Sequence, residues 1–172
     1  VSNELGIAPV VTHAGLDLWN FKRIDPSQPR LIENLEQIIS FTGTMDERYF
    51  CLIMTEIEAI GSEVFNDIMN MPGLMITQNV NGIIQALEKL FGCIVRINNS
   101  LDKMFPKHDK DKLISGCEPH VFFNVIRPYL AGWHDQGLVF EGVSDDITHF
   151  KGGSAAQSSL IQLFDIVLGV LH

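Results

Sequence analysis

The chain has 172 residues, of which 46% are apolar, enough for one domain of ordinary size with a substantial core. Acidic residues (21) outnumber basic residues (12), which gives a formal charge of -9. A protein that binds nucleic acid by neutralising phosphates is therefore disfavoured, as is one that binds an anionic membrane surface. The apolar residues come in short clusters, and no run approaches the roughly 18 residues that cross a bilayer. We expect a soluble protein.

Cysteine usage and the first residues indicate a cellular compartment. The three cysteines, Cys51, Cys93 and Cys117, include no C-x-x-C pair, which predicts neither a disulfide framework nor a structural zinc site. The start has neither a secretory signal nor an initiator Met. We therefore expect a cytoplasmic location and interpret the chain as part of a longer polypeptide.

Helical periodicity dominates the chain, and no alternating stretch is bounded by hairpin turns, so we predict an all-α fold. The first helix is expected from about Val10 to Ile24, where Asp25, Pro26 and Pro29 stop it. A short helix is expected at 31–39.

Two long apolar stripes follow in the central part of the chain. One helix is expected from Asp46, whose carboxylate can accept free N–H groups at a helix start, to about Asn70, where 71–73 (Met-Pro-Gly) should end it. The next is expected from about Ile76 to Asn99. Stripes of this length should pack on each other.

The last third combines a charged connection, a helix and a long loop. Alternating Asp and Lys residues at 102–112 indicate a solvated connection rather than a basic binding patch. A helix is expected from Glu118 to Trp133, with Pro128 kinking it or removing one backbone hydrogen bond. The glycine-bearing loop at 132–153 is long enough to suggest a functional role.

A final apolar helix is expected to begin at Ser154 or Ser158 and to reach Leu171. Just before it, Gly152 and Gly153 allow close backbone approach to a planar cofactor or an anion, and the alternative is a plain glycine-bearing helix entry.

The histidines form no local metal site. None of the pairs has a helical metal-ligand spacing, so ligands would have to be assembled at long range, and a structural role is favoured for each. They are residues 13, 108, 120, 134, 149 and 172.

One constellation suits a small ligand. Phe122 and Phe123 precede Arg127 by about one helical turn, and Phe123 and Arg127 share a face at i, i+4. An aromatic plate beside a guanidinium suits a flat ring that carries a carboxylate. The alternative, which spacing alone favours, is that both phenylalanines are core residues and Arg127 pairs with an acid such as Glu58.

Several runs of the sequence closely resemble the indoleamine 2,3-dioxygenase family of haem enzymes. The C-terminal runs are the most specific, and together the matches cover almost the whole chain. They are HVFFNVIRPYLAGW (120–133), GLVFEGV (137–143), FKGGSAAQSSLIQLFDIVLGV (150–170), LGIAPVVTHAGLDLWNFKRIDP (5–26) and YFCLIMTEIEAIG (49–61).

The resemblance implies that residues 1–172 are one helical unit, a portion of the large catalytic domain without the small N-terminal domain. It implies haem b as cofactor, and O2 and tryptophan or a related indoleamine as substrates, with the pyrrole ring opened to N-formylkynurenine. By resemblance, Phe122 packs on the substrate ring, Arg127 holds the substrate carboxylate and Phe50 is a further pocket wall. Gly153, Ser154 and Ala155 match the loop beside the haem and the polar end of the substrate, and Phe123 is placed with the haem pocket.

Two positions of the haem pocket depart from the family pattern. Met54 stands where a small hydroxyl residue commonly faces bound oxygen, and His13 stands where an aromatic residue is usual. One hypothesis is that His13 supplies the polar distal group that Met54 cannot. The alternative is a histidine bonded to a backbone carbonyl.

The iron ligand is expected outside this chain, because the proximal histidine of the family lies well downstream of the Gly-Gly-Ser-Ala loop. His149 or His172 is a less favoured ligand, since neither lies on an apolar helical face with an evident partner.

Three other functions stay open: a non-catalytic haem protein that binds O2, a haem enzyme acting on another indole, and a helical interaction module without cofactor. The oligomeric state is left open.

Overall fold

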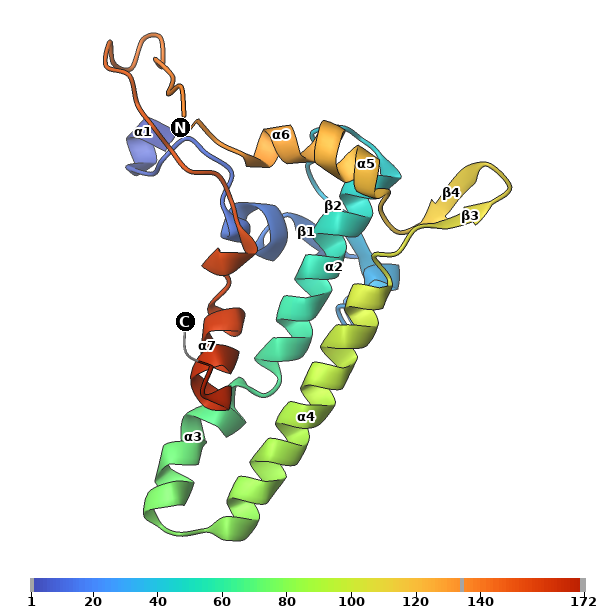
Figure 1. Ribbon diagram of the computed structural model, residues 1–172, viewed down its shortest axis with the longest axis vertical. Helices are drawn as coiled ribbons and strands as arrows, with labels where there is room; N and C mark the ends of the chain where they lie inside the picture. Colours follow the sequence, from blue (N-terminus) through green and yellow to red (C-terminus); the bar gives the residue numbers. More distant parts are fainter. Residues whose placement is uncertain (1, 134, 171–172) are drawn as a thin grey trace.

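The computed structural model describes residues 2–133 and 135–170. Its centre is formed by α2 (Met45–Ser62) and α4 (Val80–Asp102), which pack on each other as predicted and run side by side in Figure 1. Each helix begins at a side-chain cap: Thr44 Oγ1 accepts a hydrogen bond from the Glu47 backbone N–H, and Asn79 Oδ1 from that of Gly82.

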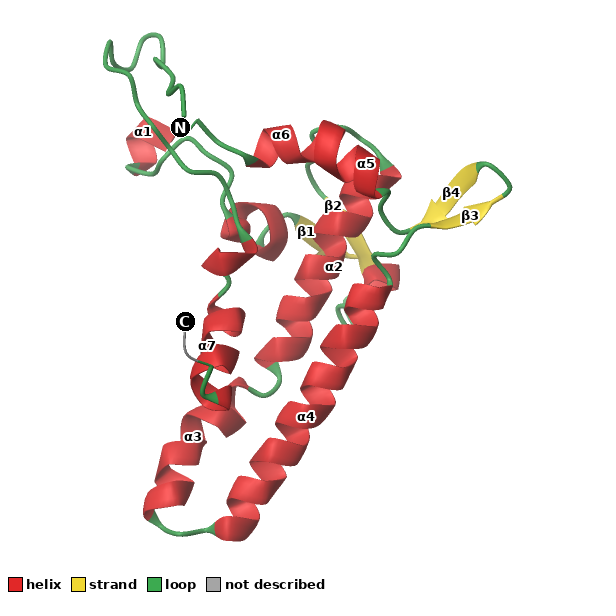
Figure 2. Ribbon diagram, viewed as in Figure 1, coloured by secondary structure: helices red, strands yellow, loops and turns green. Residues whose placement is uncertain are grey.

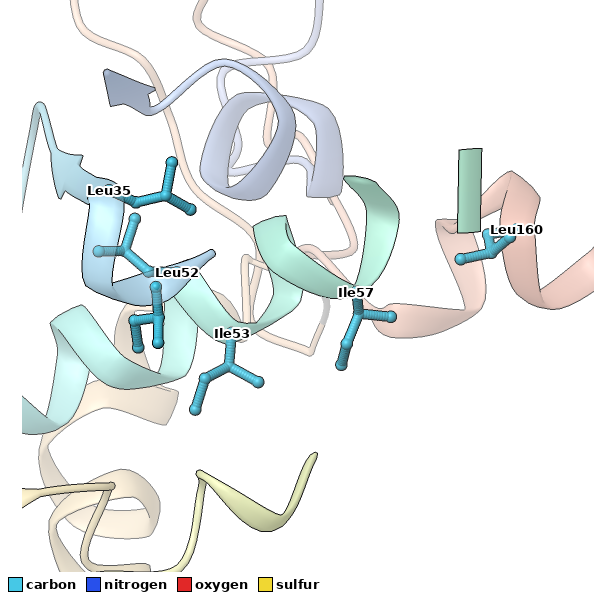
Figure 3. Close-up of a cluster of buried hydrophobic side chains, with 6 residues drawn as sticks. Leu35, Leu52, Ile53, Ile57 and Leu160 are labelled. Carbon is cyan, nitrogen blue, oxygen red and sulfur yellow. The ribbon is translucent and has the colours of Figure 1, made fainter. Parts of the chain in front are cut away.

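The core lies along α2. One buried cluster joins α2 to the segment before it and to α7 (Ser159–Leu168), as Figure 3 shows. The cluster consists of Ile32, Leu35, Leu52, Ile53, Ile57 and Leu160. A second cluster joins the end of α2 and α3 (Phe65–Ile76) to α4 through Ile60, Val64, Ile68, Leu90 and Cys93.

The predicted end of the first long helix is wrong. The chain breaks instead at Glu63 and Val64, and α3 then continues through Pro72 to Ile76. The break changes the direction of the chain so that Val64 and Ile68 can pack against α4. Pro72 has no N–H to donate to the carbonyl of Ile68, four residues before it, so α3 passes through Pro72 with one backbone hydrogen bond fewer.

The predicted helix at 10–24 is also wrong. Only a five-residue π-helical turn, η1 (Ala14–Leu18), forms there, and β1 (Phe21–Arg23) follows it. The Asn20 side chain donates to the Ile39 carbonyl and accepts from the Ile39 N–H, both at 2.8 Å. These bonds favour a strand over a helix.

The expected helix at 31–39 is a 3-10 turn, η2 (Ile32–Asn34), followed by β2 (Leu35–Gln37). β2 pairs antiparallel with β1, with Lys22 opposite Glu36. The charged connection contains a second hairpin, β3 (Lys107–Asp109) and β4 (Lys112–Ser115). The fold is predominantly helical, as predicted, with two short hairpins that were not expected (Figure 2).

The helix predicted from Glu118 forms as three joined pieces: α5 (Pro119–Val121), η3 (Phe122–Ile126) and α6 (Arg127–Leu130). η3 is a π-helical turn, in which the Arg127 N–H bonds to the Phe122 carbonyl. Pro128 follows at once and has no N–H to donate, so the widened turn lies where the ordinary helical bond is lost.

A short helix, α1 (Ser2–Leu5), was not predicted. The loop at 132–153 forms, and its ends pair through a bridge between Gly132 and Lys151. After η4 (Ala155–Gln157), Ser158 caps α7, which ends at Gly169 in a left-handed conformation; the predicted end at Leu171 lies outside the described residues. Within the part of the chain that the structure describes, no helix is long and apolar enough to span a membrane.

Candidate functional site

Helix α2 supports the segments that carry the predicted site. Phe50, Met54 and Glu58 recur every fourth residue and so follow one side of this helix. Phe50 contacts η3, and Glu58 contacts both His13 and the segment before α7. Met54 is half-buried and packs against the core cluster of α2.

The Phe50 and Phe122 rings lie against each other, with centroids 4.7 Å apart and planes inclined by 40°. Together they form part of the wall of a cavity of about 310 Å³. Its other lining residues are Leu101, Met104, Phe105, Pro106, Cys117 and Pro119. The two aromatic residues therefore lie together, in surroundings that suit an apolar ring.

Arg127 and Phe123 share a face, as their spacing predicts. The guanidinium carbon lies 5.1 Å from the centroid of the Phe123 ring, and the ring is 59% exposed. The alternative that Phe123 is a core residue is therefore wrong, and so is the pairing of Arg127 with Glu58, which bonds to His13 and Ser158 instead. Among the residues that the structure describes, Arg127 has no acidic partner.

The π-helical turn affects where Arg127 lies relative to Phe122. In an α-helix, residues five apart diverge around the axis, whereas the i to i+5 bond of a π-turn places residue 127 one turn above residue 122. The exposed guanidinium and the ring that lines the cavity therefore belong to consecutive turns of one helical segment.

The His13 side chain lies between two carboxylates and is only 6% exposed. Its Nδ1 lies 2.8 Å from Asp17 Oδ2 and its Nε2 lies 2.9 Å from Glu58 Oε1. The alternative of a side chain bonded to a backbone carbonyl is therefore wrong. Because both ring nitrogens are engaged within the protein, the geometry does not support the hypothesis that His13 donates to bound oxygen.

Asp17 is the unusual acid of this group. Its pKa is raised to about 7, mainly by burial; His13 lowers the pKa, and the nearby Glu58 contributes to the rise. One of its carboxyl oxygens, Oδ1, has no hydrogen-bond partner among the described residues. The Cys51 thiol is a further neighbour of this carboxyl.

We predict that replacing Asp17 with Asn changes how stability depends on pH. Between about pH 4 and 7 the Asp17 carboxyl of the folded protein holds a proton that the unfolded chain has released. Its contribution to the stability of the folded protein is therefore complete below the ordinary pKa of an Asp carboxyl, and it is lost as pH rises through about 7. Asn cannot ionise, so Asp17→Asn should gain stability relative to the wild type as pH rises.

Thermal unfolding of the intact protein between about pH 5 and 8 measures this effect. Asp102→Asn, at an exposed position, is the control and should follow the wild type. If the unfolding temperatures of the wild type and Asp17→Asn change with pH in parallel, burial does not hold the proton on this carboxyl.

The double glycine allows close approach to the chain's own backbone. A Cβ atom on Gly152 would lie 1.7 Å from the Leu130 carbonyl oxygen, and one on Gly153 would lie 3.2 Å from that of Val11. The sequence predicts that this turn can lie flat against a planar cofactor. At Gly152 the turn packs on the end of α6 instead. Ser154 and Ala155, which follow, are exposed.

The described residues form no metal site made of several protein ligands. No group of three or more His, Cys, Asp or Glu side chains among them lies close enough to hold a metal ion. Burial raises the pKa of the thiols of Cys51, Cys93 and Cys117, which disfavours the thiolate form that binds metals. His149 packs beside Gly137 in the long loop, and His172 lies outside the described residues.

Two residues that bond to His13 or Glu58 were not predicted from the sequence: Asp17 and Ser158. Asp17 could have been found, because it stands four residues after His13, the spacing at which side chains meet along a helical turn. Ser158 had no such signal, because its hydroxyl bonds to a glutamate 100 residues away.

A comparison of the sequence with family models decides the classification. The model described as indoleamine 2,3-dioxygenase matches residues 1–172. The chain belongs to the indoleamine 2,3-dioxygenase family. The match includes all the runs that carry the resemblance in the sequence: 5–26, 49–61, 120–133, 137–143 and 150–170.

Individual relatives agree with this membership. An indoleamine 2,3-dioxygenase of Saccharomyces cerevisiae is 38% identical over 98% of this chain and 38% of its own length. The indoleamine 2,3-dioxygenase 2 of Mus musculus is 34% identical over the whole chain and 42% of its own. A 6-hydroxytryptophan 2,3-dioxygenase of Fusarium equiseti is 31% identical, also over 42% of its own length. The chain thus spans less than half of these relatives.

Proposed function

We propose that the intact protein is a haem-dependent dioxygenase that opens the pyrrole ring of tryptophan, or of a related indoleamine, with O2 to give N-formylkynurenine. Membership of the indoleamine 2,3-dioxygenase family supports the reaction class. The observation that carries the proposal is the exposed Arg127 guanidinium beside the Phe123 ring, without an acidic partner in the described part of the chain. A guanidinium beside an aromatic ring suits an aromatic amino acid that carries a carboxylate.

The candidate residues of this chain lie on the substrate side of the proposed site. Phe50 and Phe122 supply apolar walls for the indole ring, and Arg127 binds the carboxylate with two parallel hydrogen bonds. Ser154 and Ala155 lie beside the polar end of the substrate. These contacts would hold the indole in one orientation and limit the access of water to it.

Haem b would activate dioxygen in this enzyme. We propose that its iron ligand comes from outside residues 1–172 and that this chain forms the opposite, substrate-binding side. We further propose that residues 1–172 form one helical unit of the catalytic domain and that the protein is cytoplasmic, in keeping with its three free cysteines.

Product formation tests the proposal. The intact protein is reduced without oxygen, mixed with tryptophan and then with O2, and N-formylkynurenine is followed by its near-ultraviolet absorbance. 6-Hydroxytryptophan is assayed in parallel, because one relative is named for it. A protein with a Soret band that forms a stable O2 complex but no product would be a non-catalytic haem protein, and a protein without a Soret band would have no haem function.

A further inference from the structure

One carboxylate of α2 forms hydrogen bonds to two segments that are far apart in the sequence. Glu58 Oε1 bonds to His13 Nε2 at 2.9 Å and also accepts a hydrogen bond from the Ser158 hydroxyl. The backbone N–H of His13 in turn donates to Gln157 Oε1 at 3.2 Å. The segment before η1 and the segment before α7 are therefore bound to α2 and to each other.

Most of this junction is buried, although the Glu58 side chain is 16% exposed. Ser158 is 1% exposed and His13 is 6% exposed. Hydrogen bonds to a charged group are strong in such surroundings, and leaving one partner unsatisfied is costly. The junction is therefore a firm attachment point, in contrast to the ion pairs on the protein surface.

A short hydrogen-bonded turn connects the attachment point to the predicted substrate contacts. In η4 the backbone N–H of Gln157 donates to the Ser154 carbonyl and that of Ser158 donates to the Ala155 carbonyl, both at 2.9 Å. Ser154 Oγ also accepts from the Ala156 N–H at 3.2 Å. Fixing Ser158 thereby limits the positions that Ser154 and Ala155 can adopt.

We propose that Glu58 is a positioning residue that, acting through Ser158 and held in place by His13, sets the Ser154–Ala155 turn against the substrate. This inference rests on the proposed function, because that function assigns the turn to the polar end of the substrate. Glu58 itself does not touch the substrate. Its contribution is the geometry of the turn, so its loss weakens substrate binding more than turnover.

Ser158 variants of the intact protein test the proposal. Ser158→Ala removes the donor to Glu58, and the KM for tryptophan should rise about 5- to 10-fold, with a smaller change in kcat. Ser158 also caps α7, so Ser158→Asp is included: it keeps an acceptor for the cap but repels Glu58, and should raise KM at least as much. Ser158→Thr retains the hydroxyl and should restore a KM near that of the wild type.

Ser100→Ala is the matched control. Ser100 is 2% exposed and donates at 2.6 Å to Glu56, a different glutamate of α2, away from the turn. It should lose comparable stability without a change in KM. A purely structural role for Ser158 would make both alanine variants alike in KM, which would overturn the proposal.

Amide hydrogen exchange without substrate provides a second readout that does not depend on activity. Exchange at residues 154–158 should become faster in Ser158→Ala and Ser158→Asp but not in Ser100→Ala. Unchanged exchange would overturn the positioning role even if KM rose. A wild-type protein that forms no product would instead refute the proposed function, and the exchange result would still show whether Glu58 holds the turn.

Discussion

Replacing Arg127 with Leu is expected to lower kcat/KM for tryptophan by about 30- to 150-fold, which corresponds to about 2 to 3 kcal/mol of lost interaction with the carboxylate. The loss should fall mainly on KM, because a carboxylate distant from the reacting ring is bound alike in the ground state and the transition state. Arg127→Lys should recover only part of the loss, since an ammonium cannot make the two parallel hydrogen bonds of a guanidinium.

The structure offers a close control for this change. Arg30 is also exposed and lies over a phenylalanine ring, with its guanidinium carbon 5.9 Å from the Phe21 centroid. Arg30→Leu should leave kcat/KM unchanged, and neither substitution should lower the unfolding temperature appreciably, because both guanidinium groups are exposed. Equal kinetic effects at the two positions would show that Arg127 has no special role.

The second large effect is expected at Gly152, where Ala should destabilise the protein by at least about 3 kcal/mol. A methyl group there would overlap the Leu130 carbonyl oxygen, 1.7 Å from the Cβ position, and backbone cannot move aside as a flexible side chain can. The bridge between Gly132 and Lys151 would have to open, along with the Trp133 N–H bond to the Phe150 carbonyl at 2.7 Å.

Gly92→Ala is the control for Gly152→Ala. Gly92 lies on the exposed face of α4 with no atom within 4 Å of its Cβ position, so alanine should stabilise the helix by about 0.5 to 1 kcal/mol. Chemical denaturation of the intact proteins measures both changes. The close packing at Gly152 would be refuted if the two variants shifted stability in the same direction.

The parts of the fold that were predictable from the sequence are those with long, regular periodicity. The stripes of α2 and α4 extend over many turns, so packing and local preference agree, and only their ends were misplaced. Residues 10–24 were misjudged because the outcome depends on Asn20 bonding to Ile39, a contact between segments that no local pattern predicts.

The candidate site divides in the same way. The contact between Phe123 and Arg127 follows from a four-residue spacing and was predictable. The surroundings of His13 were not predictable, because Glu58 lies 45 residues away from it and Ser158 lies a further 100 residues from Glu58. Likewise, the sequence indicates that the double glycine permits close approach of another group to the backbone, but only the structure shows that Gly152 faces the backbone of Leu130.

If Arg127 binds the carboxylate of an aromatic amino acid, a cycle of two ligands and two proteins will isolate that contact. Equilibrium binding of tryptophan and of tryptamine, which lacks the carboxylate, is measured for the intact wild type and for Arg127→Leu. We predict that the wild type prefers tryptophan by about 30- to 150-fold and that the variant shows almost no preference. A variant that keeps the wild-type preference would contradict this role of Arg127.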